Sequence, residues 1–116
     1  MKAIRVKETP SEWIVFPPFD RDWLGIPRDG RWTFDGNLEN PTFSPSINEA
    51  WGGEGQTHED MERTGPAHRR HVFVRNGQIE YLGDCTHHAC ETHTLRLLTE
   101  AEIALAYPDH PEWIDR

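Results

Sequence analysis

The chain has 116 residues and a formal net charge of −8 at pH 7. A chain of this length buries one hydrophobic core, so we expect one domain over residues 1–116. The one short basic run is HRR at 68–70, and nucleic-acid surfaces need clustered Lys and Arg, so a nucleic-acid partner is disfavoured. The sequence has no apolar run of membrane-spanning length and starts without a signal-peptide segment, which argues against a membrane location and favours a cytoplasmic one.

The first third of the chain indicates short strands. AIRV at 3–6 and WIVF at 13–16 are rich in β-branched and aromatic residues, and the TPSE between them favours a turn. In RWTF, Trp32 and Phe34 alternate with polar residues before an Asp-Gly pair that permits a tight reversal. The prolines of NPTFSPSI cannot donate to a sheet ladder, so we expect residues 40–47 to form an edge or an irregular extended segment.

Residues 48–66 are polar, acidic and rich in glycine, and they show no sustained helical or strand period. This composition is typical of a long mobile loop, which is our prediction for the segment. Trp51 lies within it. Its large amphipathic side chain is predicted either to serve as a contact group for a protein partner or to fold back over the sheet.

The segment HVFVRNGQIEYL predicts a β-hairpin. Two alternating apolar runs flank the Asn-Gly at 76–77, the pair that most readily adopts the positive φ angles of a two-residue turn. This turn would place His71 opposite Leu82 and, further out, His68 opposite Cys85. One face of the hairpin then carries Val72, Val74, Ile79 and Tyr81. The opposite face carries His71, Phe73, Leu82 and Asp84.

The C-terminal part indicates one more strand and a helix. THTLRLL has strand character, and LTEAEIALAY reads as a short helix that Pro108 ends. Thr99 would cap this helix while Glu102 returns the bond in a capping box. The predicted fold class is therefore mostly β (α+β): a small antiparallel sheet with a central hairpin at 71–83, a long acidic loop and one short C-terminal helix.

Both cysteines and three of the seven histidines lie in GDCTHHACETH, residues 83–93. Zinc takes four thiolate or imidazole ligands, which structural sites draw from separated segments. Because the hairpin brings an upstream histidine toward this segment, the predicted zinc ligands are Cys85, His87 and Cys90, with His71 or His93 as the fourth. We expect Asp84 and His68 to support the ligands by hydrogen bonding.

Other interpretations of this cluster stay open. Cys85 can be a small buried side chain beside exposed histidines. A disulfide between Cys85 and Cys90 is sterically possible but needs oxidising surroundings, so it ranks lower. Cys85 with His87 and Asp84 also contains a nucleophile, a base and a carboxylate, although working triads normally assemble from separate segments.

The blocks WTFDGNLENPTFSPSI and HVFVRNGQIEYLGDCTHHA resemble those of a family of small bacterial and phage or prophage proteins described only as a domain of unknown function. The resemblance covers residues 31–47 and 71–95. It implies a shared site at the family's recurrent polar positions, which here are His71, Asp84, Cys85 and His87. Relatives often have Cys where this chain has Arg70 and an Ala-Gly pair at 90–91, so either Cys90 replaces the lost thiol or the site no longer binds metal.

From these observations the sequence favours a zinc-stabilised β domain that is not an enzyme and acts by binding another protein. The association of the family with mobile elements and with bacterial ubiquitin-like conjugation genes implies an accessory role in phage-host conflict. The competing hypothesis is a metal-dependent hydrolase. In that case His71, Cys85 and His87 hold the metal and leave one coordination position open for water.

Overall fold

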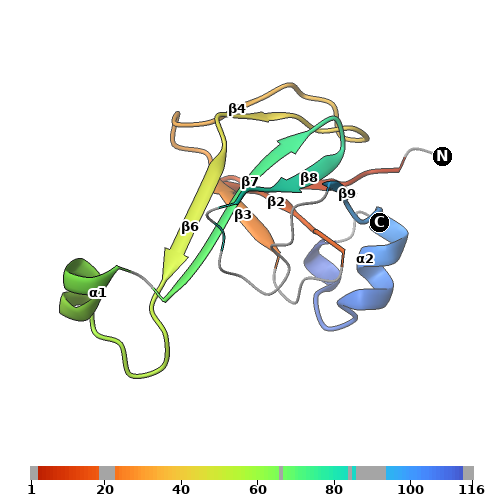
Figure 1. The fold of residues 1–116 in the computed structure, drawn as a ribbon. Coiled ribbons are helices and arrows are strands. Elements are labelled where there is room, and N and C mark those ends of the chain that lie inside the picture. The colour runs from red at the N-terminus through yellow and green to blue at the C-terminus, as the bar shows by residue number, and fades with distance from the viewer. Residues whose placement is uncertain (1–2, 19–22, 66, 84, 86–93, 114–116) are drawn as a thin grey trace.

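The computed structural model describes residues 3–18, 23–65, 67–83, 85 and 94–113 (Figure 1). Within these residues it has three antiparallel sheets and two short α-helices, so the mostly β fold class is confirmed. The elements in chain order are β1 (Val6–Glu8), β2 (Glu12–Val15), β3 (Leu24–Pro27), β4 (Thr33–Phe34), β5 (Phe43–Ser44), β6 (Ile47–Trp51), α1 (His58–Thr64), β7 (His68–Arg75), β8 (Gln78–Tyr81), β9 (Thr94–Arg96), α2 (Glu100–Ala106) and the 3₁₀ helix η1 (Pro111–Trp113). Neither α-helix of the described part is long and apolar enough to cross a membrane.

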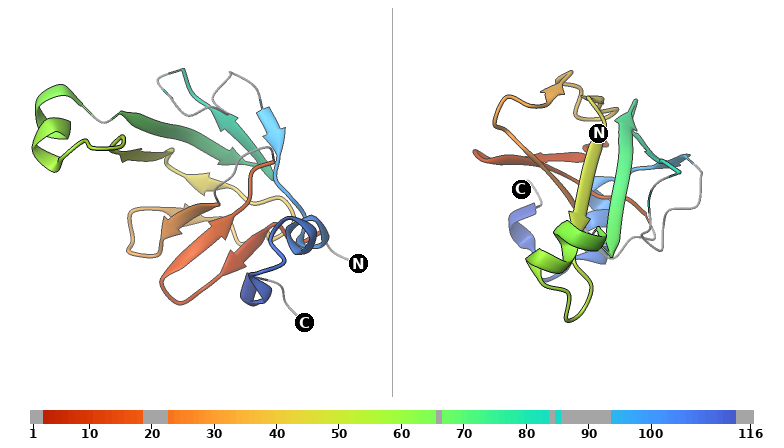
Figure 2. Two further views of the ribbon diagram at one scale, coloured as in Figure 1. Left: turned by 90° about the horizontal axis from the view of Figure 1, so that it is seen from below. Right: turned by 60° about the vertical axis from the view of Figure 1, so that its left-hand side comes forward.

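The main hydrophobic core lies between two of the sheets. One sheet has the order β1-β2-β3 and the other β6-β7-β8-β9, while β4 and β5 pair separately. Figure 2 shows the two larger sheets on opposite sides of the core. The core includes Val15, Leu24, Ile26, Phe43, Ile47, Val72, Val74, Ile79, Tyr81 and Leu97. Each fully buried side chain of this kind stabilises the fold by about 1.5–3 kcal/mol, so these contacts hold the sheets together.

Strand β2 is covered on both faces. Val15 belongs to the main core, and Trp13 packs against the same cluster. A second cluster consists of Ile14, Phe16, Ile103 and Trp113. Because successive side chains of a strand point to opposite faces, β2 contacts the four-stranded sheet on one side and α2 with η1 on the other.

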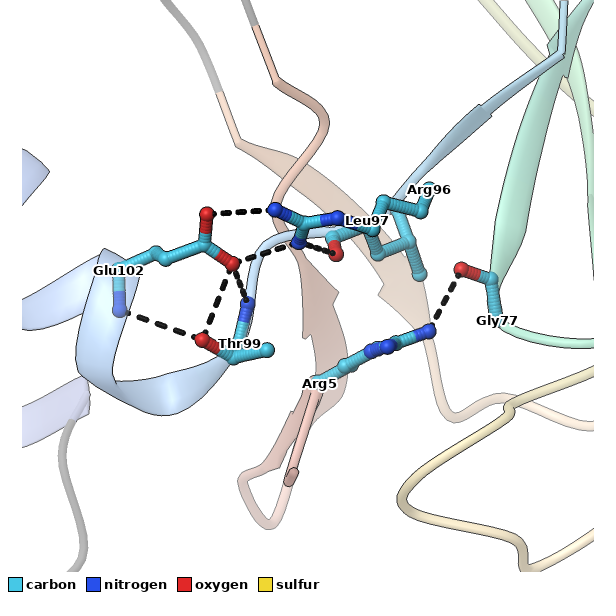
Figure 3. Close-up of polar contacts among 6 residues, drawn as sticks. All are labelled: Arg5, Gly77, Arg96, Leu97, Thr99 and Glu102. Atoms are coloured by element: carbon cyan, nitrogen blue, oxygen red, sulfur yellow. Dashed lines mark hydrogen bonds and ion pairs between the residues drawn. The ribbon is translucent and has the colours of Figure 1, made fainter.

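The hairpin prediction is confirmed. Its strands are β7 and β8, with Val72 opposite Tyr81. Asn76 and Gly77 have φ angles of 54° and 77°, as a two-residue turn of this type requires. Arg5 Nη1 donates to Gly77 O at 3.4 Å, which ties the turn to the N-terminal segment (Figure 3).

Helix α2 begins with the predicted capping box. Thr99 N donates to Glu102 Oε1 at 3.0 Å, and Thr99 Oγ1 accepts from Glu102 N at 3.4 Å. Arg96 of β9 donates to both carboxylate oxygens of Glu102, at 2.6 and 2.8 Å (Figure 3). The pKa of Glu102 is lowered to about 2, mainly by the hydrogen bonds from the Arg96 guanidinium and to a smaller extent by the bond from the Thr99 amide. These contacts fix the start of α2 to the end of β9.

The prediction of one long loop over residues 48–66 is wrong, because the structure has a strand end and a helix there. The first residues of the segment belong to β6, and α1 follows, so the sequence predicted one helix too few. All seven residues of α1 are described, and none of them is buried. The helix therefore has no buried apolar face, and the sequence shows no helical spacing of apolar residues there. A capping box between Thr57 and Asp60 stabilises its start instead. The mobility of the segment stays a prediction.

Candidate functional site

Ser46 lies where the proline-rich segment 40–47 enters β6. The segment is irregular, as predicted, with a two-residue strand and a cis peptide bond before Pro45. Trp32 Nε1 donates to Ser46 O at 3.3 Å. The next residue, Ile47, is buried in the core. Since side chains alternate along a strand, the hydroxyl of Ser46 is directed to the outer face of the sheet.

His71 lies on the same outer face, on the adjacent strand β7. The antiparallel register places Ile47 opposite Val72 and Asn48 opposite His71. A diagonal across this ladder brings Ser46 Oγ within 3.0 Å of His71 Nε2. When Nε2 carries no proton, the hydroxyl donates to it. This is the arrangement in which an imidazole removes the proton of a serine nucleophile.

The residue before His71 points to the opposite face. Arg70 is only 3% exposed, and its Nη2 lies 2.7 Å from Glu49 Oε2. The same nitrogen donates to Trp23 O at 3.0 Å. At the position where the resemblance leads us to expect a cysteine, the chain therefore has a buried cation that links β7 to β6 and to the residue preceding β3.

Most residues of the predicted zinc site fall outside the described residues. This applies to the ligands His87, Cys90 and His93 and to the supporting residue Asp84. Of the remaining residues, His68 stacks on Trp51, with ring centroids 5.5 Å apart, while His71 contacts Ser46. Among the residues that the structure describes, no group of three or more His, Cys, Asp or Glu can hold a metal ion. The zinc site therefore stays a prediction.

Cys85 follows β8 and packs partly buried against the main core. Its backbone N donates to Leu82 O at 3.1 Å, which forms a turn. Cys85 is disulfide-bonded, the state that the expected reducing compartment disfavours. Because metals bind the thiolate, a zinc site that includes Cys85 is a prediction for the reduced chain.

Ser46 is the functional residue that sequence reasoning missed. It stands in PTFSPSI, inside one of the blocks that carry the family resemblance, so the motif did contain a signal. Its partner was hidden because β6 pairs with β7 across the segment that contains α1. The register of such a connection is not specified by any two-residue turn, in contrast to that of the hairpin.

Comparison with known proteins gives one match. A family model described as "Bacterial ubiquitination-like system serine protease (BubE)" matches residues 23–82, just over half of the chain. Both Ser46 and His71 lie in this range, whereas the cysteine-rich segment follows it. No curated protein and no solved structure matches the chain. The expectation of a small bacterial family is thus confirmed, while a phage origin stays a prediction.

Proposed function

The chain belongs to the family of bacterial ubiquitination-like system serine proteases (BubE), and we propose on this basis that it cleaves peptide bonds with Ser46 as nucleophile and His71 as general base. The observation that carries the proposal is the 3.0 Å contact between Ser46 Oγ and His71 Nε2. The two residues come from separate strands, as working nucleophile-base pairs normally do. We refer to them below as the Ser-His dyad.

The proposed reaction has two stages. In the first, His71 Nε2 takes the hydroxyl proton as Ser46 Oγ attacks the carbonyl carbon of the substrate. The C–N bond then breaks, the imidazolium gives its proton to the leaving amine, and the acyl group stays on Ser46. In the second stage the imidazole deprotonates water, which attacks the acyl ester and releases the acid. His71 returns its proton to Ser46 Oγ, so the dyad is restored.

We propose Asp84 as the carboxylate that orients His71. Leu82 N donates to His71 O at 2.9 Å, and Asp84 follows Leu82 by two positions in the sequence. A carboxylate that accepts from Nδ1–H holds the tautomer in which Nε2 is free to accept the serine proton. Asp84 lies outside the described residues, so this role rests on its spacing.

The proposal gives the predicted protein partner a defined role, because that partner becomes the substrate. It replaces the non-enzymatic role that the sequence favours. The contact between the dyad residues also argues against the metal-dependent hydrolase, since a metal on His71 Nε2 would displace the Ser46 hydroxyl. The two enzymatic mechanisms differ in whether a chelator affects the reactivity of Ser46.

A small alkyl fluorophosphonate tests the proposal directly, because it phosphonylates serines that an adjacent base activates, with loss of fluoride. We expect mass spectrometry to find one phosphonyl group, on Ser46, and Ser46→Ala to remove it. Ser44→Ala is the matched control, since Ser44 is exposed on β5 and separated from the dyad serine by one residue. A chelator should leave the labelling rate unchanged. Labelling of Ser46→Ala at the wild-type rate would refute the assignment.

A further inference from the structure

Strand β6 is the outermost strand of the four-stranded sheet and begins directly after Ser46. We propose that the edge of β6 away from β7, which no strand of the described residues pairs, binds the substrate as an added antiparallel strand, with the residues on the amino side of the cleaved bond lying along Asn48 and Ala50. The partner is therefore an extended peptide segment. The proposal rests on the function assigned above to Ser46 and adds how the substrate is held.

The direction of the backbone groups of β6 follows from the neighbouring ladder. Leu82 N donates to His71 O at 2.9 Å, so the peptide groups of His71 face β8. In an antiparallel ladder the residues alternate between facing one neighbour and facing the other, so the peptide groups of Val72 face β6. Ile47 lies opposite Val72 and bonds to it across the ladder. The backbone N–H and C=O groups of the β6 residues that alternate with Ile47 therefore face away from β7, toward the outer edge of the sheet.

Those residues are Asn48 and Ala50, and both are exposed. Each directs one N–H and one C=O away from β7, which makes a short row of donors and acceptors suited to another extended chain. Ser46 follows the same alternation, and its outward carbonyl accepts from Trp32 Nε1 at 3.3 Å. Figure 1 shows β6 beside β7 at the end of the sheet opposite to β9.

The polarity of β6 decides which side of the substrate is held. β6 runs away from Ser46, so an antiparallel chain runs toward it and delivers a carbonyl carbon to the hydroxyl. The residues before that carbonyl then lie beside Asn48 and Ala50. Since the Ser46 carbonyl is already bonded to Trp32, strand pairing ends at the dyad. The edge thus positions the acyl side of the substrate and leaves the amine side free to depart.

A proline substitution at the edge tests this model without breaking the sheet. Ala50→Pro removes an N–H that points outward, and edge strands accept proline at such positions. Ala50→Gly is the matched control because it keeps the N–H. The readout compares two probes with the same fluorophosphonate group, one carrying a short alkyl chain and the other a pool of acetylated tripeptides on the acyl side.

We expect the peptidyl probe to label the wild type faster than the alkyl probe. Ala50→Pro should lower the ratio of the two rates by about tenfold, through one lost hydrogen bond and the blocked approach. Ala50→Gly should keep the ratio, and the rate of each protein with the alkyl probe serves as the denominator that corrects for any change at Ser46 itself. If the alkyl probe fails to label the wild type, the proposed function fails, whereas an unchanged ratio in Ala50→Pro refutes the edge alone.

A second measurement uses the wild type, so it does not depend on how the proline variant folds. Peptidyl probes with N-methylated amides cannot donate to the edge and should lose their rate advantage by a similar factor. Equal rates for methylated and unmethylated pools would overturn the proposal. So would a wild-type dimer that Ala50→Pro dissociates, because the edge would then pair with a second copy of the chain.

Discussion

The two faces of the β6–β7 ladder carry different kinds of side chain at neighbouring residues. The outer face carries the Ser-His dyad, half-buried and beside exposed backbone. The inner face carries buried apolar residues and the ion pair of Arg70 with Glu49. His71 and Arg70 are adjacent in the chain, yet His71 contacts the Ser46 hydroxyl on the outer face and Arg70 is buried on the inner face.

If Ser46 and His71 act as proposed, residues one position apart along a strand serve the reaction and the stability of the fold separately. A substitution on the outer face should change the reaction with little change in the free energy of unfolding. A substitution on the inner face should do the reverse. Each prediction below tests that separation or extends it to another part of the molecule, beginning with the largest expected effect.

Replacing His71 with Asn should slow fluorophosphonate labelling of Ser46 by about 10³–10⁴-fold, because the general base is removed. The thermal midpoint should stay close to that of the wild type, since His71 is half-buried on the outer face. Labelling kinetics and thermal unfolding on the same sample measure both. A large loss of stability in this variant would contradict the division between the faces.

Replacing Arg70 with Ala should destabilise the protein by about 3 kcal/mol, because it removes a buried side chain that bonds to both Glu49 and Trp23 O. Urea unfolding followed by tryptophan fluorescence measures the effect. Glu49→Gln should also destabilise the protein, since the buried guanidinium of Arg70 keeps a hydrogen-bond acceptor but loses its counter-charge. The labelling rate of the folded fraction should match the wild type in both variants. A specific loss of labelling would show that the inner ion pair also serves the dyad.

Zinc tests whether His71 has a further role. In the reduced chain we expect about one bound zinc ion, and zinc at a hundredfold excess over its Kd should stabilise the protein by about 2.7 kcal/mol. Cys90→Ala should lower the zinc content measured by elemental analysis. Because Ser46 engages His71, we expect His93 as the fourth ligand and no effect of zinc on labelling. Full zinc content in Cys90→Ala would contradict the ligand set.

The smallest effect is expected at α2, away from the ladder. Glu102→Gln should destabilise by less than about 1 kcal/mol, because the amide oxygen can still accept from Thr99 N and only the solvent-screened ion pair with Arg96 is lost. The pKa of Glu102 is lowered from 4.5 to about 2. Its stabilisation is therefore present above pH 4.5 and is lost as the pH falls toward 2. Unfolding at pH 7 and pH 3 measures this, and the difference between variant and wild type should shrink at the lower pH.

The elements that the sequence predicted correctly are those specified by a few adjacent residues. Asn76 and Gly77 define the hairpin turn, and Thr99 with Glu102 defines the start of α2. In each case the deciding hydrogen bonds and φ angles lie within four residues. Both predictions therefore held without knowledge of the tertiary structure.

The dyad is of a different kind. Ser46 and His71 meet only because β6 adopts one register against β7, and a slip of one residue would move Ser46 to the other face. The sequence marked His71 as functional but associated it with the cysteine-rich segment instead of Ser46. Helix α1 lies between the two strands and has no buried residue. The sequence therefore contained no indication that the connection between β6 and β7 includes a helix.

The double burial of β2 limits how this chain can vary. Trp13 and Val15 contact one apolar compartment, and Ile14 contacts the other. Inserting one residue into the strand would direct the side chains on one side of the insertion into the wrong compartment. Natural variants of altered length should therefore have insertions before or after β2 and none within it. The length of β2 is thus more constrained than that of the segments on either side of it.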